Sequence, residues 1–347
     1  IDLAKYVGRV IDLEKANLAF ETDSPSTSAE LMAYVHLHYD DIISKLDSMF
    51  LGRGTILNFA GPMQLKIHLA NSQPILNQGQ IGVLSQNRIN LNPAQMHRAA
   101  NVLLCISTDS SMQEKDIELR AMESIRRGFM DIKEDIGELQ TFLNAVPDNP
   151  TRSQIIALAA LMVLNSLSSN RTDGRFALVT FSDQARKFSV QKNERVLNFV
   201  EFASDFSSKE VMASLVYSIL DTVDDTGGKL KAASAYRSIA ELLEEFGRDR
   251  PTLVILLTST IVDESDESEP FIRAIAQMSG YQLDVFSFDR NVNIEKAKTA
   301  LRGLNARILP VRSFSGHIFD GYILDAFSHL LEGASDVTTE HDLEGSQ

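Results

Sequence analysis

The sequence predicts a doubly wound α/β fold, in which helices cover both faces of a mostly parallel sheet, preceded by an N-terminal helical and β extension. Two observations lead to this prediction. From about residue 101 onward, short runs rich in β-branched residues alternate with amphipathic helical patterns. Several of these runs are apolar throughout, which is typical of strands buried on both faces of a parallel sheet.

The composition excludes several classes of protein. Of 347 residues, 44% are apolar and 23% charged, as is usual for folded globular proteins. The net charge of −14 argues against nucleic-acid binding, which depends on Lys and Arg neutralising phosphates. No apolar stretch reaches the roughly 18–20 residues that a membrane span needs, and no secretory signal pattern opens the chain. We therefore expect a cytoplasmic (intracellular) protein with protein partners, no nucleic acid and no direct membrane span.

The first hundred residues, 1–100, are expected to form the extension. Helical patterns cover 1–20 and 27–51, and three short strands are expected at 55–59, 63–69 and 81–84. The segment 71–95 is rich in Asn and Gln, which predicts a loop, with a β-turn region or simple compositional drift as alternatives.

Residues 101–333 supply the predicted sheet and its helices. The run 186–190 follows the second strand after a turn too short for a crossover, which predicts an antiparallel edge strand. The acidic segment 334–347 is expected to be a flexible tail. The expected parallel strands are 101–107, 176–181, 252–258, 282–288 and 307–311, and the expected helices are 153–169, 193–205, 209–221, 232–246, 268–279, 293–303 and 318–332.

Four segments in this region resemble successive parts of a von Willebrand factor A domain, a Rossmann-like fold. NVLLCISTDSSM (101–112) resembles its first strand and loop, and GRFALVTFSD (174–183) resembles its second strand. The TGGK run (226–229) resembles its glycine turn, and 253–259 resembles its fourth strand and following loop. The resemblance covers residues 101–333.

The resemblance also implies where a metal site would lie. In that family an Asp-x-Ser-x-Ser loop, a Thr in the glycine turn and an Asp after the fourth strand hold a Mg²⁺ ion that bridges to an acidic residue of a partner. The corresponding positions here, in the same order, are Ser107, Asp109, Ser111, Lys229 and Ser259. Only the second Ser of the loop is retained.

This set of side chains disfavours a metal ion. One carboxylate with hydroxyls gives Mg²⁺ little reason to shed water, and a lysine ammonium repels a divalent cation. We expect a vestigial site with no metal and no other cofactor. Three alternatives remain: Lys229 pairs with Asp109 in place of the ion, Lys229 points to solvent beside an inert loop, or the site still binds a metal.

Residues 113–152 form an expected helical insertion between the first loop and the helix that follows it. The apolar positions are spaced alternately three and four residues apart, which is the pattern of a coiled-coil seam. This seam either docks a helix of a partner or packs internally, for example on 27–51. Its residues are Met122, Ile125, Phe129, Ile132, Ile136, Leu139 and Leu143.

Signatures of catalysis are absent from the sequence. No phosphate-binding glycine motif follows a strand, Cys105 lies inside a strand expected to be buried, and no catalytic residue is assigned. We expect a non-catalytic scaffold or interaction subunit of a larger assembly, binding through the insertion and the loops at the carboxyl ends of the strands. The acidic run 263–269 is either a contact for a basic partner or a solvated helix start. The alternative functions are a divalent-metal-dependent ligand-binding domain and, by family analogy alone, an accessory factor of an AAA+ ATPase.

Overall fold

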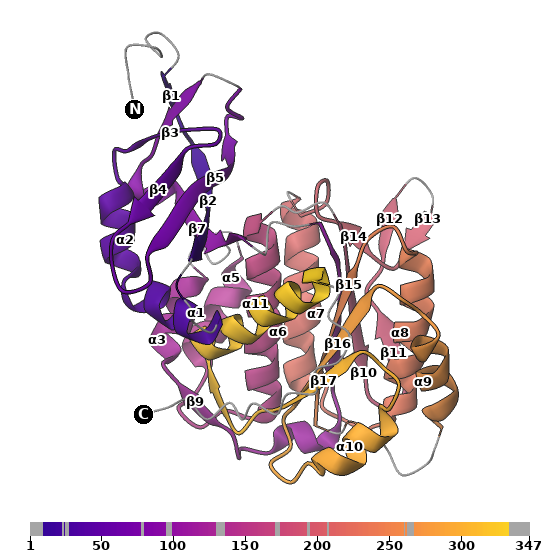
Figure 1. The fold of residues 1–347 in the computed structure, drawn as a ribbon. Coiled ribbons are helices and arrows are strands. Elements are labelled where there is room, and N and C mark those ends of the chain that lie inside the picture. The colour runs from indigo at the N-terminus through magenta and orange to yellow at the C-terminus, as the bar shows by residue number, and fades with distance from the viewer. Residues whose placement is uncertain are drawn as a thin grey trace. The chain divides into compact units, whose positions relative to one another are not determined.

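The computed structural model describes residues 10–22, 24, 28–77, 80–94, 99–129, 136–170, 174–192, 195–206, 208–259, 261 and 267–332 (Figure 1). The expected tail, 334–347, lies outside these residues, as do Ile132 and residues 263–266 of the acidic run. The chain divides into two compact units, residues 1–98 with 320–324 and residues 99–319 with 325–347.

The larger unit is built on a mostly parallel sheet. In the described part of the chain its strand order is β11-β10-β8-β15-β16-β17, and β14 also pairs with β10. Pairing is parallel from β10 through β17, whereas β11 and β14 run antiparallel to β10. The mostly parallel α/β fold and the antiparallel edge strand are therefore confirmed. The strands are β8 (Asn101–Ser107), β10 (Arg175–Phe181), β11 (Ala185–Lys187), β14 (Val200–Glu201), β15 (Thr252–Thr258), β16 (Tyr281–Ser287) and β17 (Ala306–Pro310).

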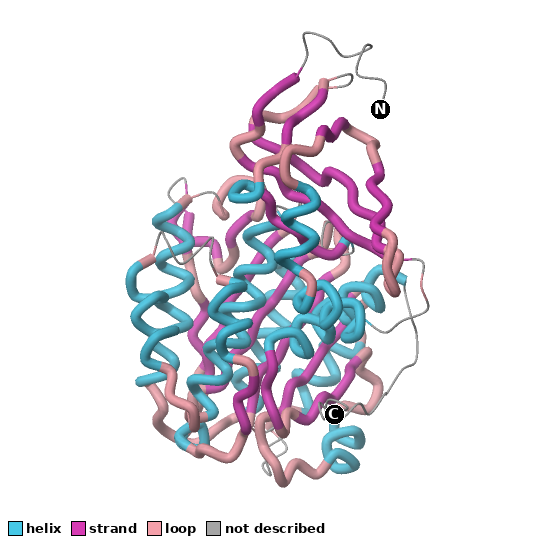
Figure 2. Tube along the Cα trace, turned by 90° about the vertical axis from the view of Figure 1, so that its left-hand side faces the viewer, coloured by secondary structure: helices cyan, strands magenta, loops and turns pink. Residues whose placement is uncertain are grey.

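Helices cover both faces of this sheet (Figures 1 and 2). Side chains from α8, α9 and α10 form one core with Leu103 and Cys105 of β8, and burial raises the pKa of the Cys105 thiol. On the opposite face α6 contacts both β8 and α7, and Phe319 of α11 packs on Phe286 of β16. The helices are α6 (Arg152–Asn170), α7 (Lys209–Asp224), α8 (Ala232–Phe246), α9 (Glu269–Ala276), α10 (Ile294–Ala300) and α11 (Gly316–Glu332).

The predicted helix at 193–205 is wrong for the residues that the structure describes. They form β13 (Arg195–Leu197), which pairs antiparallel with β12 (Val190–Lys192), and then β14. The cause is aromatic packing beside the sheet edge. Phe199 packs edge-on against Phe246, and Phe206 packs against both Phe176 and Phe202, so these apolar residues do not share one helical face.

The predicted continuous helix of the insertion is also wrong. Those of its residues that the structure describes include a short strand, β9 (Glu118–Arg120), followed by α3 (Met122–Gly128) and α5 (Gly137–Ala145). Strand β9 pairs in parallel with β18 (Ser313–Ser315). Ile136, expected inside the helix, is extended, with φ −131° and ψ 98°, and immediately precedes α5. The heptad spacing of these apolar residues therefore runs across separate elements and does not belong to one continuous helix.

The smaller unit contains two sheets, with strand orders β4-β5-β2-β7 and β1-β6-β3 among the described residues. Leu18, Phe20 and Ile67 are among its buried side chains. The elements are β1 (Val10–Asp12), β2 (Lys15–Thr22), α1 (Ser28–Leu37), α2 (Tyr39–Leu46), β3 (Phe50–Gly52), β4 (Ile56–Phe59), β5 (Leu65–Gln73), β6 (Ile81–Val83) and β7 (Ile89–Pro93).

Three predictions for this unit need correction. The described part of 1–20 forms strands, because the run from Ala16 to Phe20 is buried between β5 and β7. The predicted helix at 27–51 breaks at His38 (φ −106°, ψ 13°) and ends in strand β3. The predicted loop at 71–95 contains β7, whose Asn90 amide donates a 3.0 Å hydrogen bond to Asn17 of β2. The amide-rich sequence is here part of a sheet.

None of the described helices has the length and apolar character that crossing a membrane requires.

Candidate functional site

The most informative position in the larger unit lies between β8 and β15, where the strand order reverses direction. Open α/β sheets bind ligands at such switch points, outside the carboxyl ends of the strands. Here β8 ends at Ser107 and β15 ends at Thr258, so their following loops begin side by side. Four of the five positions implied by the family resemblance belong to these two strand ends.

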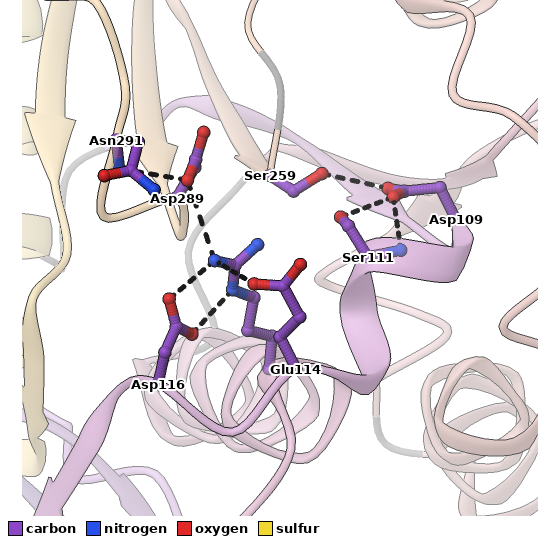
Figure 3. A network of polar contacts seen from close by, with 8 residues as sticks. Asp109, Ser111, Glu114, Asp116, Ser259, Asp289 and Asn291 are labelled. Carbon is purple, nitrogen blue, oxygen red and sulfur yellow. Dashed lines mark hydrogen bonds and ion pairs between the residues drawn. The ribbon is translucent and has the colours of Figure 1, made fainter.

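Asp109 is the centre of the hydrogen bonds at this point (Figure 3). Its Oδ1 accepts hydrogen bonds from the Ser111 backbone N–H at 3.0 Å and the Ser111 hydroxyl at 2.6 Å. Its Oδ2 accepts a 3.1 Å hydrogen bond from the Ser259 hydroxyl. The hydrogen bond from the Ser111 backbone N–H makes Asp109 the N-cap of a 3-10 helix, Ser110–Gln113. The structure thus joins three of the five expected positions directly.

The other two positions are placed differently. Ser107 is buried, and its hydroxyl lies 4.0 Å from the Met112 sulfur. Lys229 is exposed, and within the described part of the chain no ion pair or hydrogen bond connects it to Asp109. The glycine turn nevertheless contacts the first loop, because Ser110 N–H donates to Gly228 O at 3.4 Å. Of the three alternatives, the one in which Lys229 pairs with Asp109 is therefore not seen in this structure.

The donor set at Asp109 does not fit a magnesium ion. Both carboxylate oxygens already accept hydrogen bonds from the chain, and the neighbouring donors are neutral hydroxyls. Among the residues that the structure describes, no three His, Cys, Asp or Glu side chains are grouped as metal ligands. Mg²⁺ prefers carboxylate oxygens in octahedral geometry and gives up water reluctantly, so one carboxylate is a poor site.

A second cluster surrounds the buried guanidinium of Arg152 at the start of α6 (Figure 3). Its Nε and Nη2 donate to the two carboxylate oxygens of Asp116 at 2.8 and 2.6 Å. Nη2 also lies 2.8 Å from Glu114 and 3.6 Å from Asp289, which follows β16. Asp289 Oδ1 in turn accepts a 3.0 Å hydrogen bond from the Asn291 N–H. Arg152 therefore connects the segment after β8 to the loop after β16.

The electrostatics of this cluster favour its ionised form. The hydrogen bond from Arg152 lowers the pKa of Asp116, and the positive charge of Arg152 adds to that effect against partial burial. A bidentate arginine–carboxylate pair also fixes geometry, because the two planar groups meet in one orientation. The segment after β8 is consequently held in a defined conformation.

The sequence analysis did not identify this cluster. One signal was present, since an arginine in the first turn of a helix sits at the unfavourable end of the helix dipole and suggests specific carboxylate partners. The identity of those partners depends on the fold, because Asp289 and Arg152 come from segments 137 positions apart (289 − 152).

The seam residues lie largely in the interior. Ile125, Phe129, Ile136, Leu139 and Leu143 are each at most 5% exposed. Helix α5 packs on α7, and a Cβ at Gly316 of α11 would come within 2.9 Å of Ile125. Met122 is half-buried, and Ile132 lies outside the described residues. These side chains already bury their apolar surface within the chain.

Comparison with known proteins gives structural neighbours only. No family model and no curated protein sequence matches the chain. Similar solved structures include a von Willebrand factor type A protein from Catenulispora acidiphila, with 12% identity, TM-score 0.41, and coverage of 67% of this chain and 43% of that one. The conserved hypothetical protein BatB from Bacteroides thetaiotaomicron has 12% identity, TM-score 0.40, and coverage of 67% and 99%. The SpRpn10 VWA domain has 13% identity, TM-score 0.36, and coverage of 65% and 93%. These neighbours include the family that the sequence resembles.

Proposed function

We propose that this chain is a non-catalytic protein-interaction subunit, whose von Willebrand factor A-like unit binds partners through the loops at the carboxyl ends of its strands without a metal ion. The observation that supports this most is the hydrogen bond between Asp109 and Ser259. It joins the ends of β8 and β15 by neutral donors of the chain itself. A bridging cation is then unnecessary for ordering these loops.

The Arg152 cluster supports the same proposal. Loops that are ordered before binding lose less conformational entropy when a partner arrives. Arg152 orders the segment containing Glu114 and Asp116, and its link to Asp289 orders the neighbouring loop. The exposed residues of these loops, such as Lys115, are then presented in one arrangement. The larger assembly and its cytoplasmic location remain predictions from the sequence.

Two measurements on the full chain test the proposal. The first is the melting temperature in excess EDTA and in excess Mg²⁺ or Mn²⁺, for which we expect coincident curves. The second is quantitative co-purification of partners by the wild type and by Lys115→Glu, a charge reversal in the exposed segment after β8. Arg248→Glu is the matched control, since Arg248 is exposed in the turn before β15, at the opposite edge of the sheet.

We expect Lys115→Glu to lose partners that Arg248→Glu retains, with no effect of EDTA on either. Partner capture that requires Mg²⁺, together with a metal-dependent rise in melting temperature of several degrees, would instead establish the metal-dependent alternative. Equal capture by both variants and the wild type would contradict the assignment of the interface to these loops.

A further inference from the structure

Strand β4 is one edge of the four-stranded sheet in the smaller unit. It pairs antiparallel with β5 on one side, and no strand in the described part of the chain pairs with its other side. An edge of this kind presents backbone N–H and C=O groups that a further strand can bond. Ile56 and Asn58 are exposed, and Leu57 and Phe59 are half-buried. Because none of the four residues is buried, the strand is accessible to a partner.

This edge has few of the features that normally prevent strands from pairing between molecules. Natural edges are protected by charged residues, by proline or by a bulge. The sequence of β4 is ILNF, its register with β5 is regular, and no charged residue occurs between Arg53 and Lys66. Ile56 and Phe59 are residue types that favour strands. Only the length of four residues limits pairing here, so we expect a weak association.

The region around β4 is also free of acidic residues. Of the 47 Asp and Glu residues in the chain, none lies between Asp47 and Asp109 in the sequence, and strands β3 to β7 all come from that interval. Each copy of the chain has a net charge of −14, so two copies repel each other over most of their surface. Along β4 two copies can meet without bringing carboxylates of β4 or β5 together.

A second copy of β4 suits this edge. Antiparallel pairing of a strand with itself obeys a two-fold axis, the commonest symmetry of protein dimers. It places uncharged side chains opposite uncharged side chains and gives both edges their hydrogen bonds in one step. Two four-stranded sheets would then become one continuous sheet.

We propose that this chain forms a two-fold symmetric homodimer through antiparallel pairing of β4 with β4 of a second copy. The pairing uses backbone hydrogen bonds and uncharged side chains, whereas the opposing force is the repulsion between two acidic chains. Salt screens that repulsion, so association should strengthen as the salt concentration rises. This inference goes beyond the proposed function, because it concerns the smaller unit and not the carboxyl-end loops of the larger one.

Sedimentation equilibrium of the full chain tests the proposal over a concentration range of about 1–300 µM, which suits a small interface. We expect a reversible monomer–dimer equilibrium that is stronger in about 300 mM than in about 20 mM NaCl. Ile56→Lys adds a charge to the edge and should weaken dimerisation about tenfold or more. Ile75→Lys is the matched control, because Ile75 is also exposed but lies outside the strands, and it should dimerise like the wild type.

Hydrogen exchange read by mass spectrometry locates the interface. Amides of residues 56–59 should exchange more slowly as the protein concentration rises, because pairing protects the outer edge of β4. The proposal would be overturned by a chain that stays monomeric, by equal dimerisation of wild type and Ile56→Lys, by equal weakening in both variants, or by exchange at 56–59 that does not change on dimerisation. Dimerisation that weakens as salt is added would also overturn it, because the contact would then depend on charges.

The two proposals fail separately. Lys115→Glu lies in the larger unit and should dimerise like the wild type, whereas Ile56→Lys should retain the co-purified partners. Loss of those partners in Ile56→Lys would contradict the separation of the two surfaces.

Discussion

The Asp109 carboxylate accepts a hydrogen bond from the Ser259 hydroxyl at 3.1 Å, although the two residues are 150 positions apart in the sequence. Both groups are almost fully buried. The stability of a buried carboxylate depends strongly on its hydrogen-bond donors, because no water can take their place. The bond therefore links the two central strand ends of the sheet.

We predict that Ser259→Ala lowers the free energy of unfolding by about 1–3 kcal/mol, the usual cost of leaving a buried acceptor without its donor. Ser214→Ala, at an exposed position on α7, is the control and should change it by no more than about 0.5 kcal/mol. Urea unfolding measures both. In a double-mutant cycle with Asp109→Asn, additive effects would show that the two side chains do not interact.

Restoring the family's ligand pattern should create a metal response. We predict that Ser107→Asp, Asp109→Ser, Lys229→Thr and Ser259→Asp, combined in one protein, raise the melting temperature by several degrees in Mg²⁺ relative to EDTA. The variant supplies two carboxylates and removes the nearby ammonium. Wild type is the matched control and should not respond. Indifference of the folded variant would mean that these positions do not converge as the resemblance implies.

The buried pair of Asp284 and Arg307 lies between adjacent strands β16 and β17. Arg307 Nε donates to Asp284 Oδ1 at 2.9 Å, Nη2 donates to Oδ2, and Gln282 also donates to Oδ1 at 2.9 Å. Asp284→Ala removes the carboxylate that forms the bidentate pair with this buried guanidinium, so we expect a loss of about 3–5 kcal/mol in urea unfolding.

Two comparisons check the origin of that loss. The double variant Asp284→Leu/Arg307→Met should recover most of it, because both buried charges are removed together. Glu295→Ala, which breaks the exposed ion pair with Lys298, should cost less than about 1 kcal/mol. A double variant as unstable as Asp284→Ala would contradict the explanation.

The stability contributed by Asp116 should depend on pH. Arg152 lowers the pKa of Asp116 in the folded state, so the folded carboxyl is ionised where the unfolded one is still protonated. Its contribution is therefore fully present above about pH 4 and is lost as pH falls through the folded pKa. We expect the difference in unfolding free energy between wild type and Asp116→Asn to shrink accordingly in acid. A pH-independent difference would show that the ion pair is not its cause.

Gly174 approaches the backbone of Ala100, the residue before β8, too closely for any side chain. A Cβ at this position would lie 2.0 Å from the carbonyl oxygen of Ala100. We predict that Gly174→Ala destabilises the protein by about 1–3 kcal/mol or more in thermal or urea unfolding, because backbone must move. Gly137→Ala is the control, since its Cβ would meet nothing within 4 Å in helix α5, and it should be neutral or stabilising.

The sequence predicted the larger unit well because its signals are local. The strand Asn101–Ser107 is a largely apolar run, and the helix at Ala232–Phe246 has one clear apolar face. The type of each element can therefore be predicted from its own residues alone. The antiparallel edge strand near Arg186 could be predicted because the turn before it is too short for a crossover connection.

The errors arose where tertiary packing decides the structure. The run around Phe20 is helical by pattern but is buried between two strands. Phe199 and Phe202 each pack on another aromatic ring, Phe246 and Phe206 respectively. Ile136 continues a heptad spacing although the backbone there is extended. For the site, Asp109 and Ser259 were expected together, whereas the connection of Arg152 to Asp289 required the fold itself.

The pairing of β8 with β15 has a consequence for how this protein is made. Leu103 in β8 lies beside Val254, so the ribosome must synthesise about 150 further residues before the central strand has both neighbours. Strand β10 emerges earlier and covers only one side of β8. During this interval the other edge of an apolar strand is an open template for pairing with a second nascent chain. The slow step in biogenesis is therefore expected to be the closure of this central pair.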